Sequence, residues 1–530
     1  MSKYSMGIDF GTLSGRAVIV DIETNQEMAT SVCEYEHGVI AENLPEDYAL
    51  QHPKDYLDVL QKITKDSIKK SGINPEDIIG VGVDFTASTI LPVTEDGTPL
   101  CFFEEFKNRP HAYVKLWKHH SAQKEADEIN ALAKQTNEKW LKRYGEKISC
   151  EFMFPKILQI LREDEDVYNK TFRFVEAADW IVWQLTGKET HSVCTTGFKA
   201  MWSEEDGYPD RKFFKMLDAR MENVIGEKVS ENITKLSKPA GFITKEIEKK
   251  TGLKEGTTVM PAFIDAHAAL PALGVTYTGD LLMIIGTSTC HILLGDKEVD
   301  IPGISGYVKD GIVDGLYAYE AGQACVGDSF DWFVNNCVPK TYFEEAEEKG
   351  INIHKFLREK AEKIEVGANG LIALDWWNGN RTPYVNGNLK GMIAGLTIHT
   401  KPEEIYRALI EATAFGTKRI IEIYQSNGIK INNIYAAGGI AEKDELLMKI
   451  YADVIGREIY LSGTSQACAY GSAVLGAVNQ KGYKDIKEAA EKMKKVNDVV
   501  YKPNKENTEK YQVIYEKYKR FSEFFANLKD

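Results

Sequence analysis

Two stretches in opposite halves of the chain share one pattern: an apolar strand, a Gly-Thr turn and a second apolar strand. The first spans residues 6–21 with its turn at Gly11-Thr12, and the second spans residues 280–295 with its turn at Gly286-Thr287. Glycine lets the backbone approach a ligand closely, and successive turn amides form an anion-binding concavity. Each stretch alone also fits an ordinary β-hairpin. Their repetition favours two related lobes that bind one polyphosphate from opposite sides.

Length and composition indicate a globular protein of more than one domain. The chain has 530 residues, of which 43% are hydrophobic and 27% charged, so it can form two substantial cores. No run approaches the roughly 18 apolar residues of a spanning helix, and no secretory signal precedes Asp9. The eight cysteines include no C-x-x-C pair, which fits reduced thiols. We therefore expect a cytoplasmic protein without a membrane segment.

The charge of the chain limits its partners. A net charge of −14 argues against a nucleic-acid partner, because binding to a phosphate backbone needs a basic face. It does not exclude phosphorylated small molecules, which local groups hold. The final segment, residues 484–530, is rich in Lys and Glu, and we expect a helix whose charges face solvent.

Two predicted strands end in carboxylates. Residues 78–84 form an apolar strand ending at Asp84, and residues 84–89 are either a sugar-contacting loop or a simple exit from the sheet. Residues 259–264 predict a second strand, which leads into Asp265 and a run of small residues. Asp265 is either a helix N-cap or a catalytic carboxylate. Its place beside the second hairpin favours catalysis.

Lys199 follows a segment of small and apolar residues that we predict to be a loop. Lone lysines usually face solvent. Because Phe198 and Trp202 flank this one, however, we expect it to be directed inward, toward an oxygen-rich ligand.

Two further segments carry candidate features. His119 and His120 fall in a segment of helical pattern, where adjacent side chains point about 100° apart and do not form the usual metal pair. We interpret them as surface or pocket-edge residues. Residues 434–439 predict a strand ending in two glycines, followed by a helix. That turn either accommodates a flat ring against bare backbone or is a tight connection.

The chain lacks the P-loop, dinucleotide-binding, protein-kinase and zinc-protease motifs. The order of its two hairpins, isolated Asp and diglycine turn resembles the FGGY carbohydrate kinases of the actin and Hsp70 ATPase superfamily. Residues 391–416 resemble that family's long second signature. The resemblance implies an α/β protein of two actin-like (ribonuclease H-like) domains, each a mixed sheet flanked by helices, over residues 1–270 and 271–530.

Within the family, five short segments look like the ribulokinase branch: residues 84–89, 116–120, 197–202, 263–268 and 319–323. The chain departs from the Gln-Arg pair usual in the family's sugar loop, which puts a glycerol kinase or xylulokinase in doubt. The resemblance implies transfer of the ATP γ-phosphoryl group to the terminal hydroxyl of L-ribulose. Another ketopentose or pentitol, such as D-ribulose or ribitol, stays an alternative, as does a non-catalytic sugar sensor that uses ATP.

The resemblance also assigns roles to individual residues. Asp265 would be the general base, and Asp9 would hold Mg²⁺ through water. The sugar would contact Ala87, Lys199, Asp265 and Glu320. ATP would be held by Gly11, Thr12, Gly286, Thr287, Gly327, Asp331, Gly439 and Lys443. The expected partners are therefore a small sugar and ATP, and a homodimer is a candidate assembly.

Overall fold

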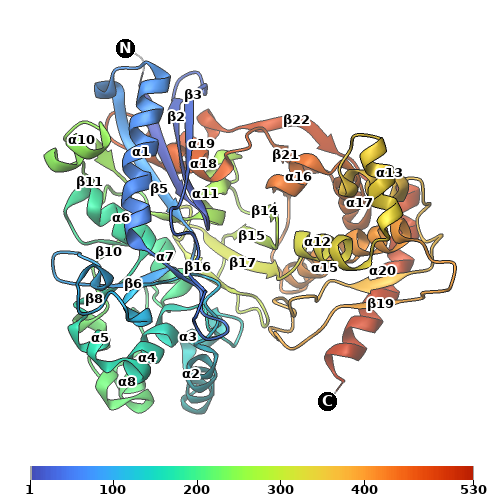
Figure 1. Ribbon diagram of the computed structural model, residues 1–530, viewed down its shortest axis with the longest axis horizontal. Helices are drawn as coiled ribbons and strands as arrows, with labels where there is room; N and C mark the ends of the chain where they lie inside the picture. The colour runs from blue at the N-terminus through green and yellow to red at the C-terminus, as the bar shows by residue number, and fades with distance from the viewer. Residues whose placement is uncertain (1–2, 529–530) are drawn as a thin grey trace.

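Two seven-stranded mixed sheets, one from each half of the chain, organise the computed structural model, which describes residues 3–528 (Figure 1). The first sheet has the order β11 (Gly241–Phe242), β12 (Thr258–Val259), β5 (Ile78–Phe85), β1 (Tyr4–Phe10), β2 (Ser14–Asp21) and β3 (Glu27–Glu34), with β13 (Phe263–Ile264) also paired to β5. The second has the order β16 (Gly306–Lys309), β17 (Tyr317–Gln323), β15 (Thr289–Gly295), β14 (Asp280–Ile285), β20 (Asn433–Ala437), β21 (Ile459–Ser462) and β22 (Val496–Tyr501).

The remaining strands form smaller sheets. They are β4 (Leu50–Gln51), β7 (Val114–Lys115), β6 (Ile90–Val93) and β8 (Arg173–Glu176) in one sheet, β9 (His191–Ser192) with β10 (Ile233–Thr234), and β18 (Ile372–Leu374) with β19 (Met392–Ala394). The expected fold class, mixed sheets flanked by helices in two lobes, is thus confirmed.

Helices flank both sheets. In the first half they are α1 (Pro53–Ser71), α2 (Gln123–Thr136), α3 (Lys139–Arg143), α4 (Met153–Glu163), α5 (Glu165–Lys170), α6 (Ala177–Thr186), α7 (Val193–Lys199), α8 (Arg211–Leu217), α9 (Val224–Glu227), α10 (Lys245–Thr251) and α11 (Asp265–Ala272). In the second they are α12 (Gly327–Cys337), α13 (Lys340–Glu348), α14 (Ile353–Ala361), α15 (Pro402–Ser426), α16 (Gly439–Lys443), α17 (Glu445–Ile455), α18 (Ala467–Gly476), α19 (Ile486–Met493) and α20 (Lys505–Ala526).

Both predicted hairpins are present. In each of them the two strands pair antiparallel, β1 with β2 and β14 with β15. The first strand of each hairpin also pairs in parallel with a central strand, β5 or β20, and such strands are buried on both faces. This explains why β1 and β5 are almost continuously apolar.

Helix α18 belongs to the second half of the sequence but packs against the first sheet. A Cβ atom on Gly7 of β1 would lie 1.7 Å from the Ala469 carbonyl oxygen, and one on Gly82 of β5 would lie 1.9 Å from that of Ser472. Only glycine permits this approach of helix to strand. Residues after 270 therefore contribute to the packing of the first lobe. The domain boundary at residue 270 stays a prediction.

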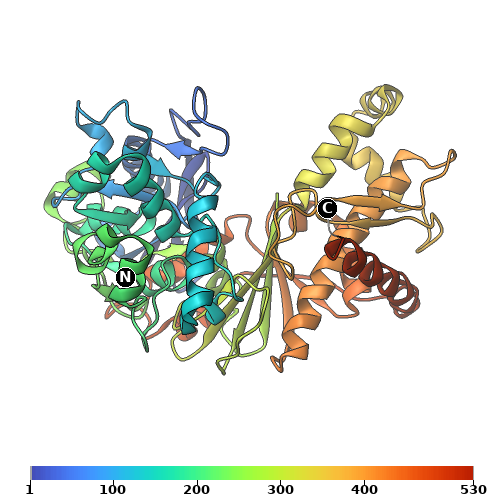
Figure 2. The ribbon, with the colours of Figure 1, turned by 90° about the horizontal axis from the view of Figure 1, so that it is seen from below.

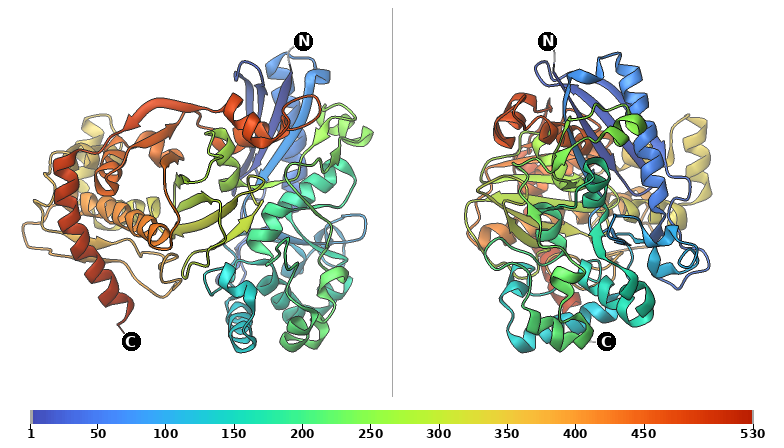
Figure 3. Two further views of the ribbon diagram at one scale, coloured as in Figure 1. Left: turned by 180° about the vertical axis from the view of Figure 1, so that it is seen from behind. Right: turned by 90° about the vertical axis from the view of Figure 1, so that its left-hand side faces the viewer.

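The two lobes meet along α11, α18 and the β14–β15 hairpin and diverge on one side (Figure 2). One hydrophobic core contains side chains from both halves, including Val18, Leu270, Leu282 and Val474. Seen from behind, β22 runs from α19 beside the first lobe back to the second lobe (Figure 3). Because β22 pairs with β21 there, the prediction of an uninterrupted helix over 484–530 was wrong.

Two local predictions were also wrong. Lys199 is the last residue of helix α7 and not part of a loop. Ser192 caps the start of that helix, and the six residues between Ser192 and Lys199 are small or apolar. His119 is not at the surface but fully buried in a turn, where its Nδ1 atom accepts from the backbone N–H of Ala49 and its Nε2 atom lies 3.1 Å from Gln159 Oε1. Turn geometry and two polar partners make that burial tolerable.

Candidate active site

Three carboxylates meet where parallel strands end. Asp9 of β1 lies opposite Asp84 of β5, and β13 pairs with the same end of β5 before leading into Asp265. Burial raises the pKa of Asp9 and, helped by the charge of Asp9, raises that of Asp84 well above its usual range. Burial and the nearby Asp9 charge raise the pKa of Asp265 to about 7. Burial and mutual repulsion therefore oppose full ionisation of the carboxyl groups gathered at this edge of the sheet.

Few groups compensate the charge that their ionisation creates. Arg16 Nε lies 3.1 Å from Asp9, and Ser472 donates to one oxygen of Asp84 at 2.6 Å. The other oxygen of Asp84 is buried and has no hydrogen-bond partner among the described residues. Carboxylate oxygens around an unsatisfied acceptor are the donor set that a hard divalent cation takes, so the residues present fit one. Asp84 was not among the predicted site residues, although its position near a strand end was a usable signal.

The second Gly-Thr turn is the centre of the predicted nucleotide site. The Gly327 N–H donates to the Gly286 carbonyl at 3.1 Å, and a Cβ atom on Gly327 would lie 3.4 Å from the Cα atom of Thr287. Gly438 has a φ of 100°, and a Cβ there would lie 2.5 Å from the carbonyl of Ile285. The structure thus brings the second hairpin, the start of α12 and the diglycine turn together.

The remaining predicted nucleotide residues lie around this centre. Gly439, next to Gly438, has open space where a side chain would be, and Lys443 is exposed at the end of α16. Asp331, one turn into α12 from Gly327, is exposed and pairs with His354 at 3.1 Å. The side chains of Lys443 and Asp331 are thus both at the surface.

First-lobe side chains fix the first Gly-Thr turn. The Gly11 N–H donates to the Ser14 carbonyl at 2.9 Å. Thr12 accepts twice, from Trp117 Nε1 at its hydroxyl (3.2 Å) and from Gln51 Nε2 at its carbonyl (2.7 Å). The turn is therefore held in place without using all its amides.

Lys199 and Glu320, predicted to bind the sugar, contact each other across the two lobes. Lys199 Nζ lies 2.9 Å from Glu320 Oε1, and His267 Nε2 lies 3.0 Å from Oε2. Burial disfavours a charged Glu320, but Lys199 and His267 outweigh it and hold the pKa of Glu320 well below its usual range. The inward direction predicted for Lys199 is what the structure shows. His267 was missed, although it lies two residues after Asp265.

Ala87 lies in the loop that leaves β5. Since β5 and β13 remain paired up to Phe85 and Ile264, Ala87 and Asp265 leave the sheet at the same edge. The loop is held by the buried Lys156, which donates to the Ser88 carbonyl at 2.5 Å. A rigid loop beside Asp265 suits backbone contact with a substrate.

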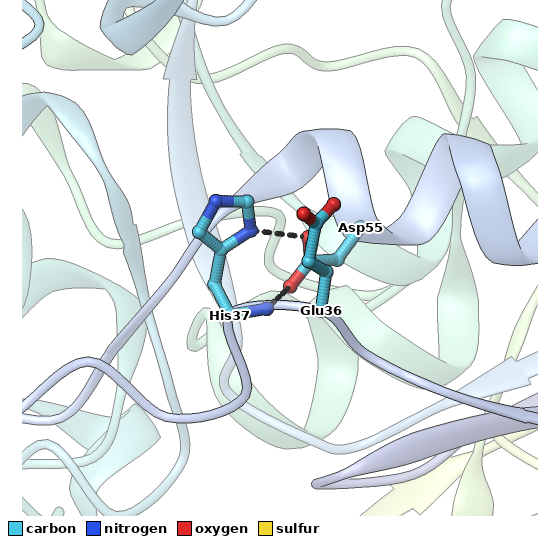
Figure 4. A group of neighbouring side chains, drawn as sticks. All are labelled: Glu36, His37 and Asp55. Atoms are coloured by element: carbon cyan, nitrogen blue, oxygen red, sulfur yellow. Dashed lines mark hydrogen bonds and ion pairs between the residues drawn. The ribbon is translucent and has the colours of Figure 1, made fainter.

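Another polar group, Glu36, His37 and Asp55, lies apart from these residues where β3 leads to α1 (Figure 4). Asp55 is buried, and it accepts from both the backbone N–H of His37 (3.0 Å) and its ring Nδ1 (2.6 Å). These two bonds satisfy Asp55 and leave no room for a cation between it and the ring. We interpret the group as a structural link from strand to helix.

Among the described residues, no helix has both the length and the apolar character needed to cross a membrane.

Residues 4–272 match the N-terminal domain, and residues 281–480 the C-terminal domain, of the FGGY family of carbohydrate kinases.

Similar proteins cover almost the whole chain. The ribulokinase of Bacillus licheniformis is 49% identical over 525 residues, covering 97% of this chain and 95% of its own. That of Mycolicibacterium smegmatis is 44% identical over 533 residues, covering 99% and 94%. A xylulose kinase structure from Lactobacillus acidophilus superposes with a TM-score of 0.82 at 20% identity over 99% of both chains, which supports the fold. The matched domains and these relatives show that the chain belongs to the FGGY family of carbohydrate kinases.

Proposed function

We propose that this protein is a ribulokinase, which transfers the γ-phosphoryl group of ATP to the terminal hydroxyl of L-ribulose and yields L-ribulose 5-phosphate. The assignment of L-ribulose as the sugar is supported by the relatives named ribulokinase, which are 41–49% identical over nearly the full chain. The chemistry rests on Asp265, whose pKa of about 7 suits a base that works near neutral pH.

Asp265 would accept the proton of the attacking hydroxyl. The hydroxyl oxygen forms a bond to the γ-phosphorus, and the bond between that phosphorus and the bridging oxygen of ADP breaks. Lys199, Glu320 and the backbone at Ala87 would orient the sugar for in-line attack. The Gly11-Thr12 and Gly286-Thr287 turns would hold the phosphates from the two lobes, through amides that their own turn hydrogen bonds leave free. Such positioning accounts for most catalysis of phosphoryl transfer.

Kinases of this family use ATP with a divalent cation, and we propose Mg²⁺ as the cation here. Asp9 and Asp84 would hold it, and when bound it neutralises charge on the phosphates. Approach of the lobes would exclude water that could otherwise take the phosphoryl group. We also propose a cytoplasmic location. We propose in addition a homodimer, and light scattering of the purified protein, which measures its mass, tests this.

A substrate panel tests the function. ADP release should be fastest with L-ribulose, compared with D-ribulose, ribitol and ATP alone, and ³¹P NMR should identify the 5-phosphate. A preference for D-ribulose or ribitol would assign the enzyme to that substrate instead. Sugar binding without ADP release, in the presence of Mg²⁺, would support a non-catalytic sensor.

A further inference from the structure

The lobes touch beside Glu320 through a segment of the second lobe, residues 376–388, here called the interlobe loop. Lys147 Nζ of the first lobe donates to the Val385 carbonyl at 3.3 Å. Next to this contact, the Gly303 N–H donates to the Gly145 carbonyl at 3.1 Å, and Gly303 lies against the backbone of Pro383. The interlobe loop is therefore fixed against residues 145–147 of the first lobe.

Arg381 extends from this loop toward the face that carries Glu320. A Cβ atom on Gly322 would lie 3.3 Å from Arg381 Cδ and 3.5 Å from its Nη1 atom. The Gly322 N–H donates to the neighbouring Thr382 hydroxyl at 3.3 Å. Residues two apart on a strand face the same side, so Gly322 and Glu320 share a face of β17. The absence of a side chain at Gly322 gives the guanidinium its path along that face.

The guanidinium is poorly paired for a partly buried side chain. Its nearest carboxylate is Glu151 of the first lobe, with Nη2 and Oε1 3.9 Å apart, which is too far for a hydrogen bond. Within residues 3–528, Arg381 donates no side-chain hydrogen bond that meets standard geometry, and its side chain is 30% exposed. A guanidinium carries five N–H donors in a rigid fork. These donors are thus free for a ligand.

Glu151 is ionised, and its carboxylate can accept further hydrogen bonds. Burial raises its pKa, but the hydrogen bond from His120 and the charges of Arg381, His120 and Lys199 outweigh this effect and hold the pKa at about 2. His120 Nε2, at 3.2 Å, is its hydrogen-bond partner. Lys199, Glu320, Arg381 and Glu151 thus alternate in charge, two from each lobe. Lys199 and Arg381 supply donors, and Glu320 and Glu151 supply acceptors.

We infer that Arg381 and Glu151 form the second half of the sugar site and determine which pentose the enzyme accepts. A five-carbon sugar carries more hydroxyl groups than Lys199 and Glu320 can pair, and each desolvated hydroxyl needs both a donor and an acceptor. The guanidinium fork suits two neighbouring sugar oxygens, and Glu151 accepts from a hydroxyl. Because the pair spans both lobes, a sugar bound between them draws the lobes together.

This inference rests on the proposed function, and the test separates the two. The variants are Arg381→Lys, which keeps the charge but loses the fork, and Glu151→Gln, which keeps the shape but loses the charge. The matched control is Lys235→Ala, which removes another contact between the two halves, the 3.0 Å ion pair with Asp310, outside the interlobe loop. KM for L-ribulose and for ATP is measured with each folded variant, together with relative kcat/KM on a panel of pentuloses and pentitols.

We expect both site variants to raise the KM for L-ribulose at least about tenfold, to change the order of preferred sugars and to leave the ATP KM within about twofold. Lys235→Ala should behave as wild type. Unchanged sugar KM and preference in both site variants would overturn the inference, as would a change confined to ATP or an equal change in Lys235→Ala. Wild-type protein that phosphorylates no pentulose would refute the proposed function instead. If Arg381→Lys fails to fold, Glu151→Gln decides alone.

Discussion

The Nζ atom of Lys199, at the end of a first-lobe helix, lies 2.9 Å from the carboxylate of Glu320, on strand β17 of the second lobe. Both side chains are nearly buried, so neither charge is satisfied by water alone. A polyol placed between the lobes would find a strong donor and a strong acceptor already aligned. The contact thus links sugar binding to the relative position of the lobes.

Lys199→Ala and Glu320→Gln should raise the sugar KM about tenfold or more while changing the ATP KM little, because each removes a hydroxyl partner. Lys235→Ala is a matched control, since Lys235 and Asp310 form another ion pair between the two halves at 3.0 Å, and neither residue is a predicted ligand contact. Steady-state kinetics with each substrate varied in turn provide the measurement. An effect confined to ATP, or an equal effect in the control, would place the pair outside the sugar site.

Asp265→Asn should abolish most turnover and leave both substrates bound. The amide keeps the shape of the side chain but cannot accept the proton, and loss of a general base typically lowers kcat by about 10²–10⁴. Calorimetry with ribulose and with a non-hydrolysable ATP analogue checks binding, and single-turnover kinetics check chemistry. A variant with near-normal kcat would remove Asp265 from the mechanism.

Turnover should fall as pH decreases through the pKa of Asp265, about 7, because the base acts only when it is unprotonated. Below that pKa, kcat/KM should decline by about tenfold per pH unit. A cation held by Asp9 would offset part of the shift, so the midpoint with substrates bound should lie lower. The profile of Asp265→Asn should lack this limb. A wild-type profile that stays flat below neutral pH contradicts the assignment.

Gly7→Ala should destabilise the first lobe. The added methyl group would overlap the Ala469 carbonyl of α18, and such overpacking typically costs about 1–3 kcal/mol or more. Gly11→Ala is the control on the same hairpin, because the nearest atom to its Cβ would be the Ser14 carbonyl oxygen at 3.4 Å. Urea unfolding compares the two variants. Equal stability of Gly7→Ala and wild type would mean that α18 can move away from β1.

Local patterns were enough to predict both hairpins, the strand that ends at Asp84 and the position of Asp265, because each depends on neighbouring residues. Lys199 was placed in a loop, since a short run of small residues gives little helical signal, and its cap at Ser192 was overlooked. Arg381 could not be found in this way. It lies in a segment without periodicity, and only the packing of that segment against β17 brings it near Glu320.

Substitutions in the two Gly-Thr turns test whether both lobes hold one polyphosphate. No atom lies nearer than 4.0 Å to a Cβ built on Gly286, so a side chain fits the unliganded fold there, as it does at Gly11. Gly11→Val and Gly286→Val should therefore fold and bind sugar. They should nevertheless lower kcat/KM for ATP by about 10²–10³, because the added side chains block backbone donors from the phosphates.

The double variant distinguishes one shared site from two independent contributions. If both turns must close on the same γ-phosphate, one obstructed turn already prevents productive closure, and the second substitution should add little. We would measure kcat/KM for ATP in wild type, both single variants and the double variant, after circular dichroism confirms folding. Strictly multiplicative losses, or a folded single variant with unchanged ATP kinetics, would refute joint binding by the two turns even if the protein phosphorylates ribulose.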